Sequence, residues 1–234
     1  MSEITLSPAD REGIRWAVEQ VVENHYLHTA PDPRSRPFVY LVSLGGRPVG
    51  CLFFGRTQAP RCFRGSLTYG GAEDIRAGRA AFDRWEILDL SRVWFTPDVQ
   101  VGGRWYTPDH LPGFVDRRGT FRSTVASTVI GMALARVGAD YLLARPPVWV
   151  DSPYAIRVVS SYCDTRVHRG VIYRAAGFRL SKPNDGPVET WWTDGVGALT
   201  DSQHRAVREA SELNPRSRRV REASRTLFPV EGLR

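Results

Sequence analysis

Apolar residues recur at helical spacing near the start of the chain. Four of them repeat at intervals of three or four positions: Ile14, Val18, Val21 and Val22. This spacing predicts a helix that continues to about His25. Ser7 would be its N-cap and Pro8 its first helical residue. On this face we expect His25 to lie on the inward side, with Tyr26 beside it.

Short apolar runs further along the chain predict strands. Residues 38–42 and 49–54 flank Gly45 and Gly46, a pattern typical of a β-hairpin. The run 85–95 is the clearest central strand. Three further strands are predicted at 155–162, 179–180 and 188–193. Residues 56–84 show no regular pattern and are predicted to be irregular.

The central strand 85–95 carries polar residues within an apolar run. Period two places Asp89 and Ser91 on one side and Glu86 and Arg92 on the other. Buried polar groups are costly unless they are paired or face a site. A structural ion pair, Glu86 with Arg92 or Asp89 with an arginine, is as good an interpretation as a site.

The stretch 160–178 reads as a strand end, a polar crossing, a short helix and a glycine turn. Asp164, His168 and Tyr173 fall on the crossing and the helix, where their side chains can converge. The alternative is a structural unit in which Tyr173 packs in the core and Asp164 caps the helix. A further helix is predicted at 123–136, with a second helical piece around Tyr141.

Composition and charge bear on partners. The chain of 234 residues has a net charge of +7, and arginine supplies almost all of the positive charge. Arginine suits phosphates, so a polyanionic partner is one hypothesis, and codon bias is the other. Three cysteines without a CxxC pair argue against a zinc ribbon and a disulfide framework. We expect no signal peptide, no membrane association and a cytoplasmic location in a bacterial host, as a monomer or homodimer.

Two regions combine basic residues with loop-like sequence. An insertion at about 96–122 interleaves arginines with aromatic residues, which suits phosphate binding and base stacking. Its candidate substrate-binding residues are Arg104, Trp105, Tyr106 and Arg118. Aromatic residues that simply cover the sheet are an equally good interpretation. We expect one catalytic domain at 1–198 and a basic tail at 199–234, helical at 202–213.

The order of these elements resembles the α+β acyltransferase fold of the GNAT family of N-acetyltransferases, a mixed, mostly antiparallel sheet flanked by helices. In that fold two central strands separate and hold donor and acceptor between them. The segment 173–178 is similar to the late helix of the family, whose tyrosine can act as general acid. The glycine-rich pyrophosphate loop is missing, because residues 122–127 read Arg-Ser-Thr-Val-Ala-Ser.

Short motifs also resemble the Mom family of phage DNA modification proteins. They are His25-Tyr26-Leu27, Leu90-Ser91-Arg92, and the stretch 161–178 with Asp164, His168 and Tyr173. The resemblance implies conversion of adenine in double-stranded DNA to a carbamoylmethyl derivative, with protection from restriction. It also implies bound iron(II).

Carried over by this resemblance, the catalytic candidates are Asp164, Tyr173, Arg92 and Ser127, and His168 is a substrate-binding candidate. His25, Tyr26 and Asp164 are the candidate iron ligands. The donor of the transferred group is open, with acyl-CoA as one option. Two alternatives stand beside this hypothesis. One is an acyl-CoA-dependent N-acyltransferase acting on a small amine or protein, and the other is a non-catalytic DNA-binding accessory protein.

Overall fold

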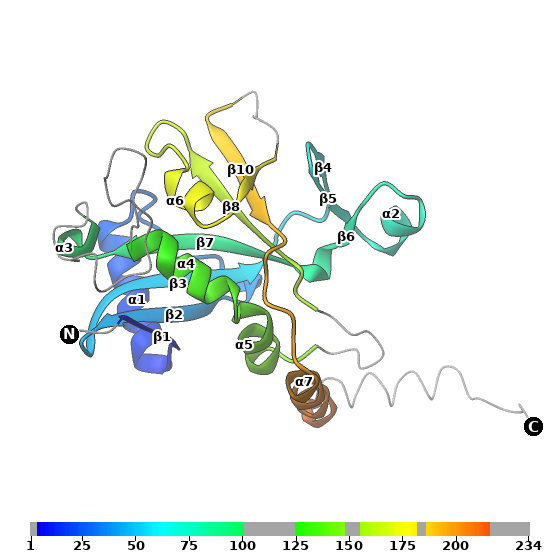
Figure 1. Ribbon diagram of the computed structural model, residues 1–234, viewed down its shortest axis with the longest axis horizontal. Coiled ribbons are helices and arrows are strands. Elements are labelled where there is room, and N and C mark those ends of the chain that lie inside the picture. Colours follow the sequence, from blue (N-terminus) through cyan, green and yellow to red (C-terminus); the bar gives the residue numbers. More distant parts are fainter. Residues whose placement is uncertain (1–3, 101–124, 148–154, 182–185, 216–234) are drawn as a thin grey trace, which may run out of the picture.

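A computed structural model of the protein describes residues 4–100, 125–147, 155–181 and 186–215 (Figure 1). A seven-stranded sheet forms its centre, in the strand order β1-β2-β3-β7-β8-β10-β9. All pairings in this sheet are antiparallel except the one between β7 and β8. Helices flank the sheet, so the predicted α+β class with its mixed, mostly antiparallel sheet is confirmed.

The elements of the main sheet are spread over the whole described chain. Its strands are β1 (Ile4–Pro8), β2 (Phe38–Leu44), β3 (Arg47–Arg56), β7 (Ile87–Phe95), β8 (Val158–Asp164), β9 (Arg179–Leu180) and β10 (Val188–Thr193). The helices are α1 (Arg11–Asn24), α3 (Pro97–Gln100), α4 (Val125–Leu134), α5 (Val137–Ala144), α6 (Val171–Ala175) and α7 (Asp201–Leu213), with short 3-10 turns η1 (Pro33–Ser35) and η2 (Arg84–Glu86).

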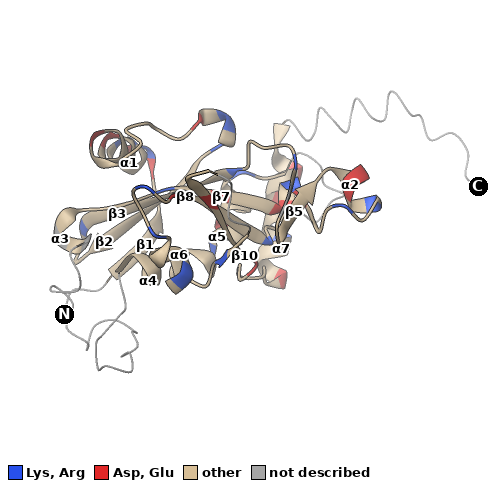
Figure 2. Cartoon of the chain, turned by 90° about the horizontal axis from the view of Figure 1, so that it is seen from above, with Lys and Arg blue, Asp and Glu red and all other residues tan. Residues whose placement is uncertain are grey.

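The two faces of the sheet carry separate cores. On one face α1 buries Ala17 and Val21 against Phe53 and Trp94. On the other face α4, α5 and α6 cover a larger core (Figure 2). Val207 of α7 belongs to this second core, and the Ser211 hydroxyl donates to the Pro147 carbonyl at 2.5 Å. The helix predicted at 202–213 is therefore present and packs on the body of the protein.

The first helix begins later than the sequence pattern predicted. Ser7 and Pro8 belong to β1, where they pair with Leu41 and Tyr40 of β2. Asp10 is the N-cap, and its carboxylate accepts a hydrogen bond from the Gly13 N–H at 2.8 Å. The prediction that Ser7 and Pro8 begin the helix is wrong, because this segment pairs with β2 instead. The spacing of residues along the sequence does not reveal this pairing.

The region 56–84 is more regular than predicted. It forms a small sheet from β4 (Cys62–Arg64), β5 (Leu67–Gly70) and β6 (Phe82–Asp83), with the short helix α2 (Ala72–Arg76). In Figure 1 this unit projects beyond one end of the main sheet. The buried carboxylate of Asp74 fastens it through Arg61 at 3.0 Å and Arg79 at 2.8 Å.

The parallel pair β7 and β8 separates part of the way along. Pairing runs from Ile87 with Val158 to Leu90 with Ser161 and then stops. Beyond this point β7 continues to pair with β3, and β8 with β10. A bulge marks the place, because Phe53 pairs with Arg92 while Phe54 pairs with Leu90, leaving Ser91 out of register. The two strands therefore open a gap in the middle of the sheet.

Among the described residues, no single helix has the length and hydropathy needed to span a membrane. The helices α4 and α5, taken together, are long and apolar enough for a span, but they are bent by 61° at the break between them. Their apolar residues, including Val129, Ile130 and Leu142, are buried in the core. Core packing accounts for their hydrophobicity.

Candidate functional site

The gap between β7 and β8 leads to a pocket of about 290 Å³, which we call the central pocket. Apolar side chains from β7, α3, α4 and α6 line most of it, and polar groups enter from the segment before α6. Its lining residues are Val93, Phe95, Val99, Ala126, His168, Arg169, Gly170, Val171, Ile172 and Tyr173. A small, mostly apolar pocket with a few polar groups is typical of a small-molecule site.

Tyr173 lies on α6 and is almost completely buried. Its ring packs against Phe178 at 5.6 Å and Trp191 at 6.4 Å between ring centroids. Burial raises the pKa of its hydroxyl to about 12, although a hydrogen bond with Ser161 acts in the opposite direction. The phenol therefore holds its proton at neutral pH and can donate it.

Five polar residues come together from the end of α1, the strand β7, the end of β8 and the loop after it. We call them the polar cluster: His25, Tyr26, Arg92, Asp164 and His168. The Tyr26 ring lies 4.4 Å from His25 and 5.0 Å from His168, between ring centroids. The phenol also interacts electrostatically with Arg92 and Asp164. Tyr173 interacts electrostatically with Tyr26 in turn. The sequence predicted that Asp164, His168 and Tyr173 lie near the end of the first helix, and Tyr26 of that segment contacts or interacts with all three. Their roles in a site stay predictions.

Arg92 is held by backbone and hydroxyl groups. Its guanidinium donates to the Thr29 carbonyl at 3.2 Å, the Thr29 hydroxyl at 3.1 Å and the Ser91 carbonyl at 2.7 Å. The predicted pairing of Glu86 with Arg92 is wrong, because Glu86 contacts Arg157 at 3.4 Å. Arg92 thus ties the segment after α1 to the bulge in β7.

Asp164 is paired with Arg166. Two side-chain hydrogen bonds, 3.0 Å from Nε to Oδ1 and 2.7 Å from Nη2 to Oδ2, engage both of its oxygens. These bonds, together with one from the Arg166 backbone N–H, lower the pKa of the Asp164 carboxyl to about 2. In this pairing Asp164 is a weak proton acceptor and a strong anchor for the loop 165–170.

His25 ends α1 and is buried. Burial, followed by the charge of Arg92, lowers the pKa of its imidazole to about 4, so the ring is neutral at pH 7. Its Nδ1 accepts the Leu27 N–H at 3.2 Å. Nε2 therefore carries the proton and acts as a donor in this tautomer.

The residues proposed to hold iron do not fit a ferrous site in this arrangement. Asp164 is bonded to Arg166 through both oxygens, and His25 uses Nδ1 for a backbone contact. Among the described residues, no group of three or more His, Cys, Asp and Glu side chains is close enough to hold a metal ion. The predicted set His25, Tyr26 and Asp164 is gathered, but not as a free ligand set.

Asp89 is a further candidate site residue. The sequence pattern indicated it as a polar residue of the central strand but gave it no role. It lies on β7 one position before the strands separate, and Ser160 of β8 donates to its carboxylate at 2.5 Å. Thr57 also hydrogen-bonds to it, and Tyr69 and Tyr162 lie next in the same network. Burial raises the pKa of the Asp89 carboxyl to about 6. The predicted arginine partner is absent from this network of described residues.

Other predicted site residues are not brought into this arrangement. Ser127 lies buried on α4, one position after Ala126 of the central pocket. Arg104, Trp105, Tyr106 and Arg118 lie outside the described residues. Their predicted roles in catalysis and substrate binding remain predictions, as does the domain boundary at residue 198.

No family model matches this chain, and neither does any curated protein. Solved structures do show likeness in the arrangement of elements. The aminoglycoside acetyltransferase AAC(6')-Ib, in complex with coenzyme A and kanamycin, is 11% identical, with 82% of this chain and 95% of that chain covered and a TM-score of 0.45. The GNAT domain of PAT from S. lividans is 11% identical over 81% and 89%, with a TM-score of 0.43. The AHL synthase LasI is 16% identical over 88% and 95%, with a TM-score of 0.41. At such low identity, the activity of this chain has to be inferred from its own side chains.

Proposed function

We propose that this chain is an N-acyltransferase that moves an acyl group from a thioester donor of the acyl-CoA type to an amine. The observation that carries the proposal is the position of Tyr173. A phenol that keeps its proton at neutral pH lines an apolar pocket at the place where β7 and β8 separate. A leaving thiolate needs such a proton donor.

The central pocket suits the thin arm of a thioester donor. Its walls are apolar along β7, α4 and α6, and Arg169 and His168 stand among its lining residues. A cation in this position favours an anionic group on the donor. The chain itself would bind and orient the donor, and the thioester would supply the reactive carbonyl carbon.

The acceptor amine would approach from the opposite face of the gap, where Asp89 lies. The amine nitrogen attacks the carbonyl carbon, so a C–N bond forms and the C–S bond breaks. Tyr173 gives its proton to the departing thiolate. Asp89, whose pKa of about 6 leaves it mostly ionised at neutral pH, takes the proton lost by the amine. Asp164 is the poorer acceptor because Arg166 stabilises its ionised form.

The experiment is a thiol-release assay with acetyl-CoA and a panel of amines. The Tyr173→Phe variant should lower kcat by about 100-fold, the usual worth of a general acid. Its folding should be little changed because the ring remains in its aromatic contacts. Thiol release that is equal in the wild type and the variant would remove Tyr173 from the chemistry.

A second candidate is the transfer of a carbamoylmethyl group to the exocyclic amine of adenine in DNA. The observation that favours it is the gathering of His25, Tyr26, Arg92, Asp164 and Tyr173, the residues carried over from the resemblance to the Mom family. This reaction is also a transfer to an amine. An adenine buried in a duplex would have to be flipped out of the stack to reach the gap.

Nucleoside mass spectrometry of DNA from cells that express the protein separates the two candidates. A modified adenosine that disappears in the Tyr173→Phe variant supports the DNA reaction. An unmodified profile, together with thiol release onto another amine, supports the first proposal alone.

A further inference from the structure

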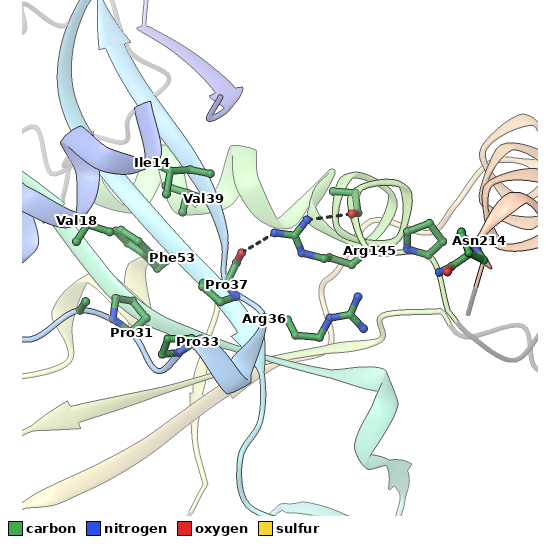
Figure 3. A pocket seen from close by; sticks show the side chains of 14 residues that line it. Ile14, Val18, Pro31, Pro33, Arg36, Pro37, Val39, Phe53, Arg145 and Asn214 are labelled. Carbon is green, nitrogen blue, oxygen red and sulfur yellow. Dashed lines mark hydrogen bonds between the residues drawn. The ribbon is translucent and has the colours of Figure 1, made fainter. Parts of the chain in front are cut away.

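A second hollow in the described part of the chain is separate from the proposed site. This outer groove has a volume of about 870 Å³ and shares no lining residue with the central pocket. Residues of α1 line it, and α1 covers the face of the sheet opposite α4 (Figure 2). Ile14 and Val18 of α1 form one wall, and Val39 and Phe53 of the sheet form the floor (Figure 3). The ends of α5 and α7 close the other side.

The walls of the outer groove are apolar and stiff. Val39 and Phe53 are almost fully buried at its floor, while Ile14 remains 37% exposed. Five prolines line it: Pro31, Pro33, Pro37, Pro146 and Pro215. Each proline fixes its own φ angle, so the loop walls are held in place before any ligand arrives. A preformed apolar pocket of this size is typical of a small-molecule site.

The charged side chains that line the groove are those of two arginines, Arg36 and Arg145. Arg145 donates to the Ala144 carbonyl at 3.1 Å and the Pro37 carbonyl at 3.3 Å, and no carboxylate in the described part of the chain pairs with it. Arg36 is exposed, and among the described residues no carboxylate pairs with it. Asp32, the acid nearest to it in the sequence, is occupied by Arg34. Figure 3 shows the Arg36 side chain on the same side of the groove as Arg145.

The backbone holds Arg36 in an unusual conformation. Its φ of 53° and ψ of 61° lie in the left-handed region, which side chains other than glycine, asparagine and aspartate rarely adopt. The 3-10 turn η1 ends there, with the Arg36 N–H donating to the Pro33 carbonyl at 3.0 Å. Arg36, which has no carboxylate partner among the described residues, therefore lines the groove from a backbone position fixed by the end of this turn.

We propose that the outer groove binds a small amphipathic anion, an apolar chain or ring with one carboxylate. The apolar part would lie along Ile14, Val18 and Phe53, and the carboxylate would pair with Arg36. Two guanidinium groups disfavour a cationic ligand, and a neutral head group would forgo the charged hydrogen bonds. This binding does not depend on the acyltransferase reaction, because the two pockets have no residue in common.

Calorimetric titration of the whole chain with three ten-carbon ligands tests the proposal: decanoate, decanol and decyltrimethylammonium. We expect decanoate to bind, decanol to bind about 10-fold more weakly and the ammonium compound not to bind. The Arg36→Asn variant, in which asparagine tolerates the left-handed backbone, should weaken decanoate binding about 10-fold and leave decanol unchanged. Ile14→Glu should weaken both, because it places a charge on the apolar wall.

Arg34→Asn is the matched control, since it removes an exposed arginine on the same 3-10 turn that does not line the groove. It should bind decanoate as the wild type does. Equal binding of all three ligands would mean unspecific apolar association and would overturn the proposal. So would decanoate binding that survives Arg36→Asn, or an absence of binding to the folded wild-type chain.

Discussion

At the scale of single residues, two carboxylates on β7 and β8 have opposite properties. Asp164 is held ionised by Arg166, whereas Asp89 is partly buried in a network of hydroxyl groups that, among the described residues, includes no arginine or lysine. The pKa of Asp164 is lowered to about 2, and that of Asp89 is raised to about 6. Two acids with such different environments are suited to different tasks.

The pH dependence of activity follows from Asp89. Because its carboxylate must be ionised to accept a proton, kcat/KM should rise as the pH increases through about 6. The Asp89→Asn variant should lose this limb of the profile and most of the activity. A pH–rate profile measured from pH 4.5 to 9 checks this, and an unchanged limb in the variant would assign the titration to another group.

Stability should change in the opposite direction. The folded-state pKa of Asp89 is above its ordinary value of 3.8, so Asp89 stabilises the folded state below that value and this contribution is lost as the pH rises through about 6. Asp89→Asn should therefore raise the free energy of unfolding at pH 7.5 by about 1–3 kcal/mol and have little effect at pH 4. Urea unfolding at both pH values measures this change in the free energy of unfolding. A variant that is less stable than the wild type at pH 7.5 would contradict an energetic cost of ionised Asp89 in the folded state.

At the scale of elements, α6 is positioned by the glycine before it. Gly170 has a φ of 63°, and a Cβ there would lie 2.6 Å from the Trp191 ring. The helix can therefore approach β10 only if residue 170 has no side chain. This close approach places Tyr173 within 6.4 Å of the same ring.

Gly170→Ala should destabilise the protein by about 2 kcal/mol or more, from overpacking and backbone strain, and should reduce activity by displacing Tyr173. Gly177→Ala is the control. Gly177 has a φ of 85°, but a Cβ there would meet nothing within 4 Å. It should cost only the backbone strain of about 1 kcal/mol and leave activity intact. Thermal unfolding with a parallel activity assay separates the two, and equal effects of both substitutions would refute the packing argument.

The elements also show how far the sequence could lead. The hairpin of β2 and β3, the central strand β7 and the closing strands β9 and β10 follow from local periodicity, and so they could be predicted. The strand β1 could not, because its partner β2 lies more than 30 residues away and Ser7-Pro8 imitates a helix start. For the same reason the sequence indicates that Asp89 is a polar residue in a buried strand but does not identify its partner. Its partner Ser160 is 71 positions away in sequence, and only the sheet register brings them together.

At the scale of the whole molecule, the arginine-rich composition and the net charge of +7 make DNA the partner to test. If the arginines neutralise phosphates, the affinity for duplex DNA should fall about 100-fold or more between 50 and 200 mM salt. Fluorescence anisotropy with a labelled duplex measures this. If no binding is seen at 50 mM salt, codon bias is the better explanation of the positive charge. That result would also argue against the adenine-modifying candidate.

The measurement that tests the central claim most directly is acetyl-CoA binding to the central pocket, since it requires no knowledge of the acceptor. Ala126 lines this pocket from α4, whereas Met132 on the same helix is 37% exposed and does not line it. Isothermal titration should show binding by the wild type and by Met132→Trp, and none by Ala126→Trp, whose indole fills the pocket. Binding that persists in Ala126→Trp, or a folded wild-type chain that binds no acetyl-CoA, would contradict the assignment of this pocket as the donor site.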